Sequence, residues 1–118
     1  NIRDDGTQSA RMIYRIVVTP SAKADIFEAL AWFRENNQDY AERWLWELSV
    51  AMSSLMKFPE RCPVALENEA FDTEVRQRLF GKRSQVFKIL FSIRSGDVFI
   101  LRVRSTRQRL LTADADDD

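Results

Sequence analysis

The chain has 118 residues, 45% hydrophobic and 31% charged, and its 18 Lys and Arg balance its 18 Asp and Glu. This length and apolar content predict one globular domain and exclude wholesale disorder. The absence of His excludes His-based catalysis and His-ligated metal sites, and the single Cys62 excludes an intramolecular disulfide. We therefore expect no metal, no cofactor, no membrane span and a cytoplasmic location.

The two ends of the chain differ from the rest. Residues 1–11 are polar and show no apolar periodicity, so they are either a tag or a disordered native extension. Residues 112–118 are almost entirely Asp and Ala, which predicts an acidic disordered tail. The folded domain is therefore expected to span residues 12–111.

The first half of this domain predicts one strand and two helices. The β-branched run Tyr14–Thr19 predicts a strand that Pro20 ends. Apolar residues then recur at helical spacing from a cap at Ser21 to Asn36 and Asn37, and again from a cap at Asp39 until Phe58 and Pro59. The short connection between the two helices predicts an antiparallel hairpin.

Three strands are predicted after an irregular stretch at residues 60–73. They span 74–80, 86–94 and 98–104, and their short, glycine-containing connections suit antiparallel hairpins. Alternation gives two of them an apolar face, made of Phe87, Ile89, Phe91 and Ile93 in the second and Phe99, Leu101 and Val103 in the third. We expect a small α+β domain of order β-α-α-β-β-β, with the helix hairpin packed on one face of an antiparallel sheet.

The opposite sheet face is predicted to be basic. Residues 75–111 contain ten Lys and Arg against Asp97 alone, a net charge of +9, whereas residues 12–74 carry six against eleven, a net charge of −5. Alternation places six of these cations away from the helices: Arg76, Arg78, Lys88, Arg94, Arg102 and Arg104. Such a face is either simply solvated or binds phosphates or an acidic partner. Because like charges on adjacent strands repel, we favour the binding surface.

Three apolar side chains of the helices lie off the predicted core stripe. Trp32, Trp46 and Val50 either pack on the sheet edges or form a dock for an amphipathic partner. The second interpretation predicts a protein partner on the helical side.

The ordered segments resemble a known family. These are PSAKADI, YAER and LMKFP in the helical half, followed by TEVRQRLFGKR, VFKILF and VFILRVR. Over residues 14–111 the chain resembles the RelE/ParE toxins of bacterial type II toxin-antitoxin, or plasmid stabilisation, modules. The resemblance implies a cytoplasmic toxin that inhibits growth and is neutralised by a cognate antitoxin in a hetero-oligomer. It also implies one of two targets, the ribosome with mRNA or DNA gyrase.

The resemblance assigns roles to the basic residues. Cleavage of RNA through its 2′-hydroxyl needs a proton acceptor, cations beside the phosphate and an acid for the leaving oxygen. The arginines of the nuclease members match Arg76 and either Arg102 or Arg104, which are the catalytic candidates. We expect other cations to bind the target, namely Arg78, Lys82, Arg83, Lys88 and Arg107. Trp32, Trp46 and Val50 are the antitoxin-binding candidates.

The chain departs from the nuclease members at two places. Ser105 stands where many relatives have a His, and neither Tyr nor His occurs near the C-terminus. Glu67, Glu69 and Glu74 are either candidate bases or solvated loop residues. An unaided nuclease is thus disfavoured and a ribosome-dependent one stays open. The alternative is a non-toxic or decayed member that only binds an antitoxin or nucleic acid.

Overall fold

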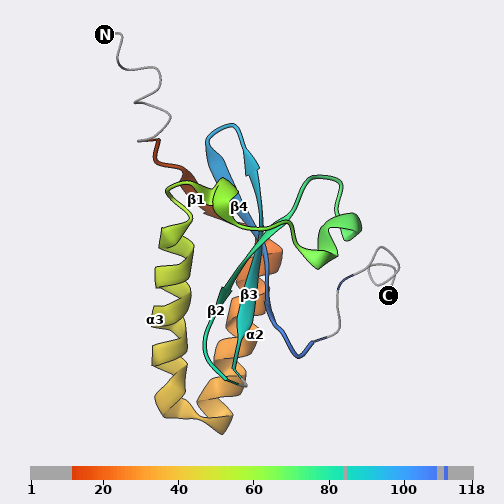
Figure 1. The fold of residues 1–118 in the computed structure, drawn as a ribbon. Helices are drawn as coiled ribbons and strands as arrows, with labels where there is room; N and C mark the ends of the chain where they lie inside the picture. The colour runs from red at the N-terminus through yellow and green to blue at the C-terminus, as the bar shows by residue number, and fades with distance from the viewer. Residues whose placement is uncertain (1–11, 84, 109–110, 112–118) are drawn as a thin grey trace.

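The computed structural model describes residues 12–83, 85–108 and 111, and the predictions for residues 1–11 and 112–118 lie outside them. The predicted order β-α-α-β-β-β is confirmed (Figure 1). The strands are β1 (Arg15–Val18), β2 (Arg76–Phe80), β3 (Phe87–Arg94) and β4 (Asp97–Ser105). The helices are α2 (Pro20–Asn36) and α3 (Gln38–Ser54), followed by two short 3₁₀ helices, η1 (Pro59–Arg61) and η2 (Leu66–Ala70).

The four strands form one sheet in the order β1-β4-β3-β2. The two predicted hairpins are antiparallel, but β1 lies parallel to β4, so the sheet is mixed. The chain returns along α3 to the start of β1, where the Tyr14 amide donates to the Met56 carbonyl at 2.8 Å. No hairpin loop joins β1 to β4, so no turn in the sequence indicates their relative direction.

The helix termini differ slightly from the sequence prediction. Thr19, not Ser21, caps α2, since its side chain accepts a hydrogen bond from the Ala22 amide and Pro20 occupies the first turn. The N-cap of α3 is Asn37, without a side-chain hydrogen bond, and the helix ends at Ser54. The left-handed φ of Phe58, 48°, then turns the chain into η1.

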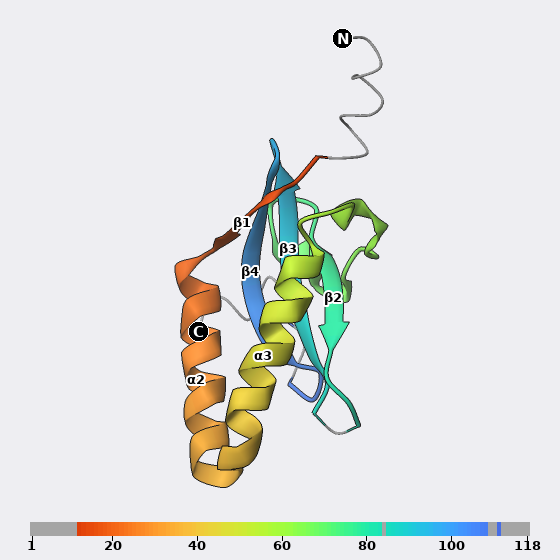
Figure 2. The same cartoon turned by 90° about the vertical axis from the view of Figure 1, so that its left-hand side faces the viewer.

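The main core lies between the helix pair and one sheet face (Figure 2). Phe33 of α2 and Trp44 of α3 pack on the rings of Phe80 and Phe87, with ring centroids 5.2–6.1 Å apart. The predicted apolar face of β3 is confirmed, because Phe87, Ile89, Phe91 and Ile93 all belong to this core. Aromatic rings of this size bury much of the apolar area of a small domain.

A β-bulge changes the predicted face of β4. Leu90 of β3 pairs with Arg102, whereas the next residue, Phe91, pairs with Ile100, so Leu101 is an extra residue. As a result Val98, Ile100 and Val103 face the helices. The prediction that Phe99 and Leu101 face them is wrong, because simple alternation does not hold across a bulge.

The other sheet face has a cover of its own. Residues 63–75, here called the outer-face cover, lie on the side of the sheet away from the helices (Figure 1). The Ala65 amide donates to the Val75 carbonyl at 2.8 Å and the Gln77 amide to the Pro63 carbonyl at 2.9 Å. Ala65 and Val75 bury Leu90 from this side, and Phe71, Leu101 and Leu111 pack around them.

Candidate functional site

The predicted basic face is divided between the two sides of the sheet. Arg76 pairs with Phe91 and Arg78 with Ile89, both of which face the helices. Cross-strand partners point to the same side, so these two arginines lie on the helix side. Their predicted place on the outer face is wrong, because alternation shows that they share a face but not which face it is.

Arg76 is the centre of a polar cluster beside η1. Its guanidinium donates to the carbonyls of Cys62 at 2.6 Å and Glu60 at 3.1 Å, and to the Glu74 carboxylate at 3.2 Å. The Tyr14 hydroxyl donates to the Glu60 carboxylate at 2.7 Å. That bond, with a smaller effect of the Arg76 charge, lowers the pKa of Glu60. The same bond, with smaller effects of burial and of the Glu60 charge, raises the pKa of Tyr14. Arg76 thus ties β2 to the segment after α3.

Arg78 and Arg61 hold the C-terminal end of α3. The Arg78 Nε donates to the Ser54 hydroxyl at 3.1 Å, and its guanidinium also donates to the Leu79 carbonyl. Arg61 donates to the carbonyls of Lys57, Phe58 and Ser54. Cations at a helix C-terminus complement its dipole and satisfy its last carbonyls. These contacts give Arg78 a structural role in addition to its predicted one in target binding.

Lys88 lies on the outer face, as predicted, but it is buried. Its ammonium pairs with the carboxylate of Glu67, a fully buried residue of η2. Glu67 is therefore part of the outer-face cover rather than a solvated loop residue. Arg104 is the cross-strand neighbour of Lys88, and burial together with the charge of Arg102 lowers its pKa.

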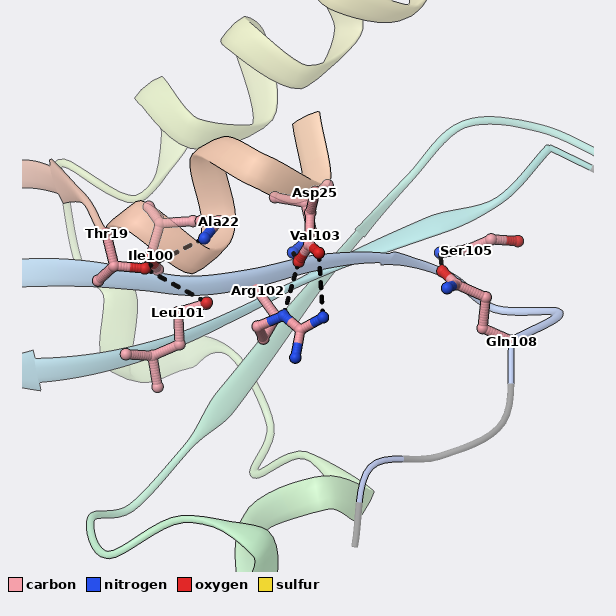
Figure 3. A network of polar contacts seen from close by, with 9 residues as sticks. All are labelled: Thr19, Ala22, Asp25, Ile100, Leu101, Arg102, Val103, Ser105 and Gln108. Atoms are coloured by element: carbon pink, nitrogen blue, oxygen red, sulfur yellow. Dashed lines mark hydrogen bonds and ion pairs between the residues drawn. The ribbon is translucent and has the colours of Figure 1, made fainter. Parts of the chain in front are cut away.

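Side chains cap the open edge of β4 beyond its pairing with β1 (Figure 3). The Asp25 carboxylate accepts from Arg102 Nε at 2.7 Å and Nη2 at 3.0 Å, and from the Val103 amide at 2.9 Å. The Thr19 hydroxyl donates to the Ile100 carbonyl at 2.8 Å. The Ser105 amide donates to Gln108 at 2.7 Å. These bonds satisfy the edge backbone and bind Arg102 in a bidentate pair.

A groove of about 410 Å³ lies between α2 and the C-terminal part of β4. Apolar rings from Trp32, Phe33 and Phe87 line it. Its polar lining comes from Asp25, Glu28, Gln85, Ser105, Arg107 and Gln108. A groove lined by apolar rings and by charged and polar side chains suits an amphipathic peptide segment.

A second cavity, of about 380 Å³, lies between the start of α3 and the β2–β3 connection. Lys82 and Arg83 are exposed on this connection, and they line the cavity with Arg43 and Gln85. Arg83 has a φ of 56°, which turns the tip of the connection. Since Gln85 lines both cavities, these cations lie next to the groove beside α2.

The three antitoxin-binding candidates lie on two separate surfaces. Trp32 is 54% exposed and belongs to the groove beside α2. Trp46 and Val50 are 68% and 47% exposed and lie on the side of α3 opposite its buried residues, Trp44, Leu48 and Ala51. The structure therefore does not bring the three together.

Two kinds of feature are absent from the part of the chain that the structure describes. No three His, Cys, Asp or Glu residues are grouped in a way that could hold a metal ion. None of the described helices has the length and apolar character to cross a membrane.

Sequence reasoning missed the carboxylates that bind the cations and the Tyr14 hydroxyl. The sequence alone does not single out Asp25 or Glu60, and it offers Glu67 only as a candidate base or a solvated residue. Tertiary packing brings Asp25 to Arg102 and Glu67 to Lys88, and it places the Glu60 carboxylate beside the Tyr14 hydroxyl rather than on a cation; no local motif indicates these contacts. Tyr14 likewise meets Glu60 only in the folded chain.

Comparison with known proteins identifies the family. Residues 16–110 match the family model described as "ParE toxin of type II toxin-antitoxin system, parDE". The chain belongs to the ParE toxin family. Its fold is similar to that of a chain from the chromosomal ParDE toxin-antitoxin system of P. aeruginosa, with a TM-score of 0.64 and 13% sequence identity over 80% of this chain and 97% of that one. A search of curated proteins gives no match.

This ParE-family chain is thus a type II toxin component by family, and the predicted RelE/ParE membership is confirmed. The family model and the fold agree on membership of the ParE family. Family membership does not by itself assign a role to any of the residues described above.

Proposed function

We propose that this ParE-family chain is a growth-inhibiting cytoplasmic toxin that acts on DNA gyrase and is neutralised by a cognate antitoxin. One observation carries the choice of gyrase over mRNA. The two arginines that RNA cleavage would require in one site face opposite sides of the sheet, since Arg76 pairs with Phe91 and Arg102 with Leu90.

The partners of these arginines support the same choice. Arg76 donates to two carbonyls and the Glu74 carboxylate, and Arg102 is held by Asp25 through two hydrogen bonds. Catalysis of phosphoryl transfer needs cations converging on one phosphate from preorganised positions. Arg104 lies on the outer face with Arg102, so neither can join Arg76 at one phosphate.

The exposed cations Lys82, Arg83 and Arg107 are the target-binding residues of this proposal. Lys82 and Arg83 lie in the β2–β3 connection, and Arg107 lines the groove beside α2. Exposed cations near a cavity attract an acidic partner over a long range.

The groove beside α2 is the antitoxin dock of this proposal. An amphipathic antitoxin segment would place apolar side chains on Trp32 and Phe33, and acidic ones toward Arg107. Because Gln85 lines both cavities, a segment in the groove would also lie next to Lys82 and Arg83. Neutralisation then follows from covering the residues that bind the target.

The experiment compares the two targets directly. The purified chain is added to gyrase with supercoiled plasmid, and in parallel to a translation extract with a defined mRNA. We expect linear or nicked DNA trapped with gyrase and intact mRNA. Cleaved mRNA without an effect on gyrase would contradict the choice of target.

Variants of the β2–β3 connection test the role of its two cations, and a variant elsewhere serves as the matched control. Lys82→Ala with Arg83→Asn removes both charges, and Asn tolerates the positive φ at position 83. We expect this double variant to lose gyrase inhibition, while Lys23→Ala, at an exposed site on α2, keeps it. A chain that binds an antitoxin tightly but leaves growth, gyrase and mRNA unaffected would instead support the non-toxic binding module.

A further inference from the structure

The outward side of α3 carries a seam that none of the functions proposed above uses. Its side chains are spaced alternately four and three residues apart and all are exposed: Asp39, Arg43, Trp46, Val50, Ser53 and Lys57. The first five lie on α3, and Lys57 lies in the turn just after its end. Spacing of this kind places side chains along one face of a helix and is the pattern by which two helices pack together.

The centre of the seam is apolar and open. Trp46 is 68% exposed and Val50 is 47% exposed, and Ser53, the next member, is small. A large exposed ring beside an aliphatic side chain is typical of the centre of an interface, where such anchors contribute most of the binding energy. The ends of the seam are charged, with Asp39 at one end and Lys57 at the other.

The seam is complementary to the same seam on a second copy when the two helices run in opposite directions. In an antiparallel pair, Asp39 of one copy meets Lys57 of the other, Arg43 meets Ser53, and Trp46 meets Val50. The spacing is the same read in either direction, so all pairs align at once. In a parallel pair Asp39 would meet Asp39 and Arg43 would meet Arg43, and these contacts repel.

We propose that the α3 seam joins two copies of this chain in a two-fold symmetric dimer with antiparallel α3 helices. The symmetry makes each Asp39–Lys57 contact occur twice, as in any interface that uses the same patch on both subunits. One helix from each copy makes a small interface, so the dimer dissociates on dilution. The groove beside α2 stays open, because Trp32 lies on a different surface from Trp46.

The test measures the mass of the full chain by sedimentation over a concentration range from about 1 μM to about 1 mM. We expect a shift from monomer to dimer. Trp46→Glu should raise the dissociation constant at least about a hundredfold, since each copy then places a negative charge at the apolar centre of the interface. Trp32→Glu, which changes an exposed Trp outside the seam, should leave the dissociation constant unchanged. Circular dichroism checks that each variant folds.

A charge exchange tests the antiparallel register. Asp39→Lys alone and Lys57→Asp alone should each raise the dissociation constant about twofold to thirtyfold, because two exposed pairs are lost. The double variant restores both pairs with reversed sign and should dimerise like the original chain. A chain that is monomeric at every concentration overturns the proposal, as does a double variant no better than the two single ones. Loss of antitoxin binding in a monomeric Trp46→Glu chain would assign the seam to the antitoxin and also overturn it.

Discussion

At the scale of single residues, the Tyr14–Glu60 hydrogen bond controls how Glu60 titrates. The bond is the main reason that the pKa of Glu60 lies below its ordinary value. A carboxyl group whose pKa is lowered by folding stabilises the folded chain above its unfolded pKa, and this contribution disappears as the pH falls through its folded pKa. Tyr14→Phe should therefore raise the pKa of Glu60, as measured by NMR titration of its carboxyl carbon.

The second tyrosine supplies the control for this prediction. The Tyr40 hydroxyl contacts Glu47 at 3.2 Å and lies in a different part of the fold. Tyr40→Phe should leave the titration of Glu60 where it is. An unchanged pKa of Glu60 in Tyr14→Phe would show that the hydroxyl is not what lowers it.

Asp25 makes three hydrogen bonds at the edge of β4. It accepts from two guanidinium nitrogens of Arg102 and from the Val103 amide, and it is mostly buried. Asp25→Asn removes the charge and should lower the free energy of unfolding by about 1.5–3 kcal/mol, the usual range for a hydrogen bond to a charged group. Urea denaturation measures the loss.

The pair between Arg15 and Asp97 is the matched comparison. Its geometry is also bidentate, with distances of 2.9 and 3.1 Å, but Arg15 is largely exposed. Asp97→Asn should therefore cost no more than about 1 kcal/mol, because solvent screens exposed pairs. Equal losses at the two sites would mean that burial does not distinguish them.

At the scale of elements, the outer-face cover converts a basic strand face into a second, small core. Glu67 neutralises Lys88 under the cover, and Ala65 and Val75 bury Leu90 beside them. A buried ion pair adds little net stability, but removing one partner leaves an uncompensated buried charge. The cover is therefore expected to depend on both members of the pair.

Replacement of Lys88 tests this dependence. Lys88→Met should lower the free energy of unfolding by about 3–5 kcal/mol, and adding Glu67→Gln should recover part of the loss. The Ala65 amide donates to Val75 and the Gln77 amide to Pro63, and these two bonds hold the cover against β2. Hydrogen exchange at both amides should be faster in the single variant. A single variant as stable as the original chain would show that the cover does not depend on the Lys88–Glu67 pair.

The strands also show how far the sequence predicts this fold. The element order and the inward face of β3 follow from periodicity, because β3 is a central strand with a regular pairing along β2. The sides to which the residues of β2 and β4 point do not follow from periodicity. The direction of Arg76 depends on its pairing with Phe91, and that of Leu101 on a bulge. Neither feature is visible in a local pattern of apolar and charged residues.

The candidate site divides in the same way. Lys82, Arg83 and Arg107 lie in connections or at a strand end, where exposure follows from the sequence alone, and they are exposed. The positions of Lys88 and Arg102 in the strands were predicted, but their carboxylate partners were not, since these come from η2 and α2. The number of Lys and Arg residues in a segment therefore predicts where positive charge is concentrated. Tertiary contacts decide which of these cations remain available to bind a target.

At the scale of the whole molecule, the net charge of zero conceals an uneven distribution. Residues 12–74 carry −5 and residues 75–111 carry +9. The fold does not simply separate these charges, because Asp25, Glu67 and Glu74 from the acidic half each pair with a cation of the basic half. Lys82 and Arg83 are among the cations that stay exposed, and the proposed function assigns target binding to them for this reason.

The three tryptophans allow the two proposed surfaces to be followed separately. Trp44 is fully buried, Trp32 lies in the groove and Trp46 in the α3 seam. In Trp46→Phe, antitoxin binding should reduce acrylamide quenching of the remaining exposed ring, Trp32, because the segment covers it. In Trp32→Phe, at concentrations where the chain is monomeric, the same antitoxin should leave quenching of Trp46 unchanged. Protection of Trp46 with no change at Trp32 would place the antitoxin dock on α3 instead of in the groove. Coverage of Lys82 and Arg83 by a segment in the groove would then no longer explain neutralisation.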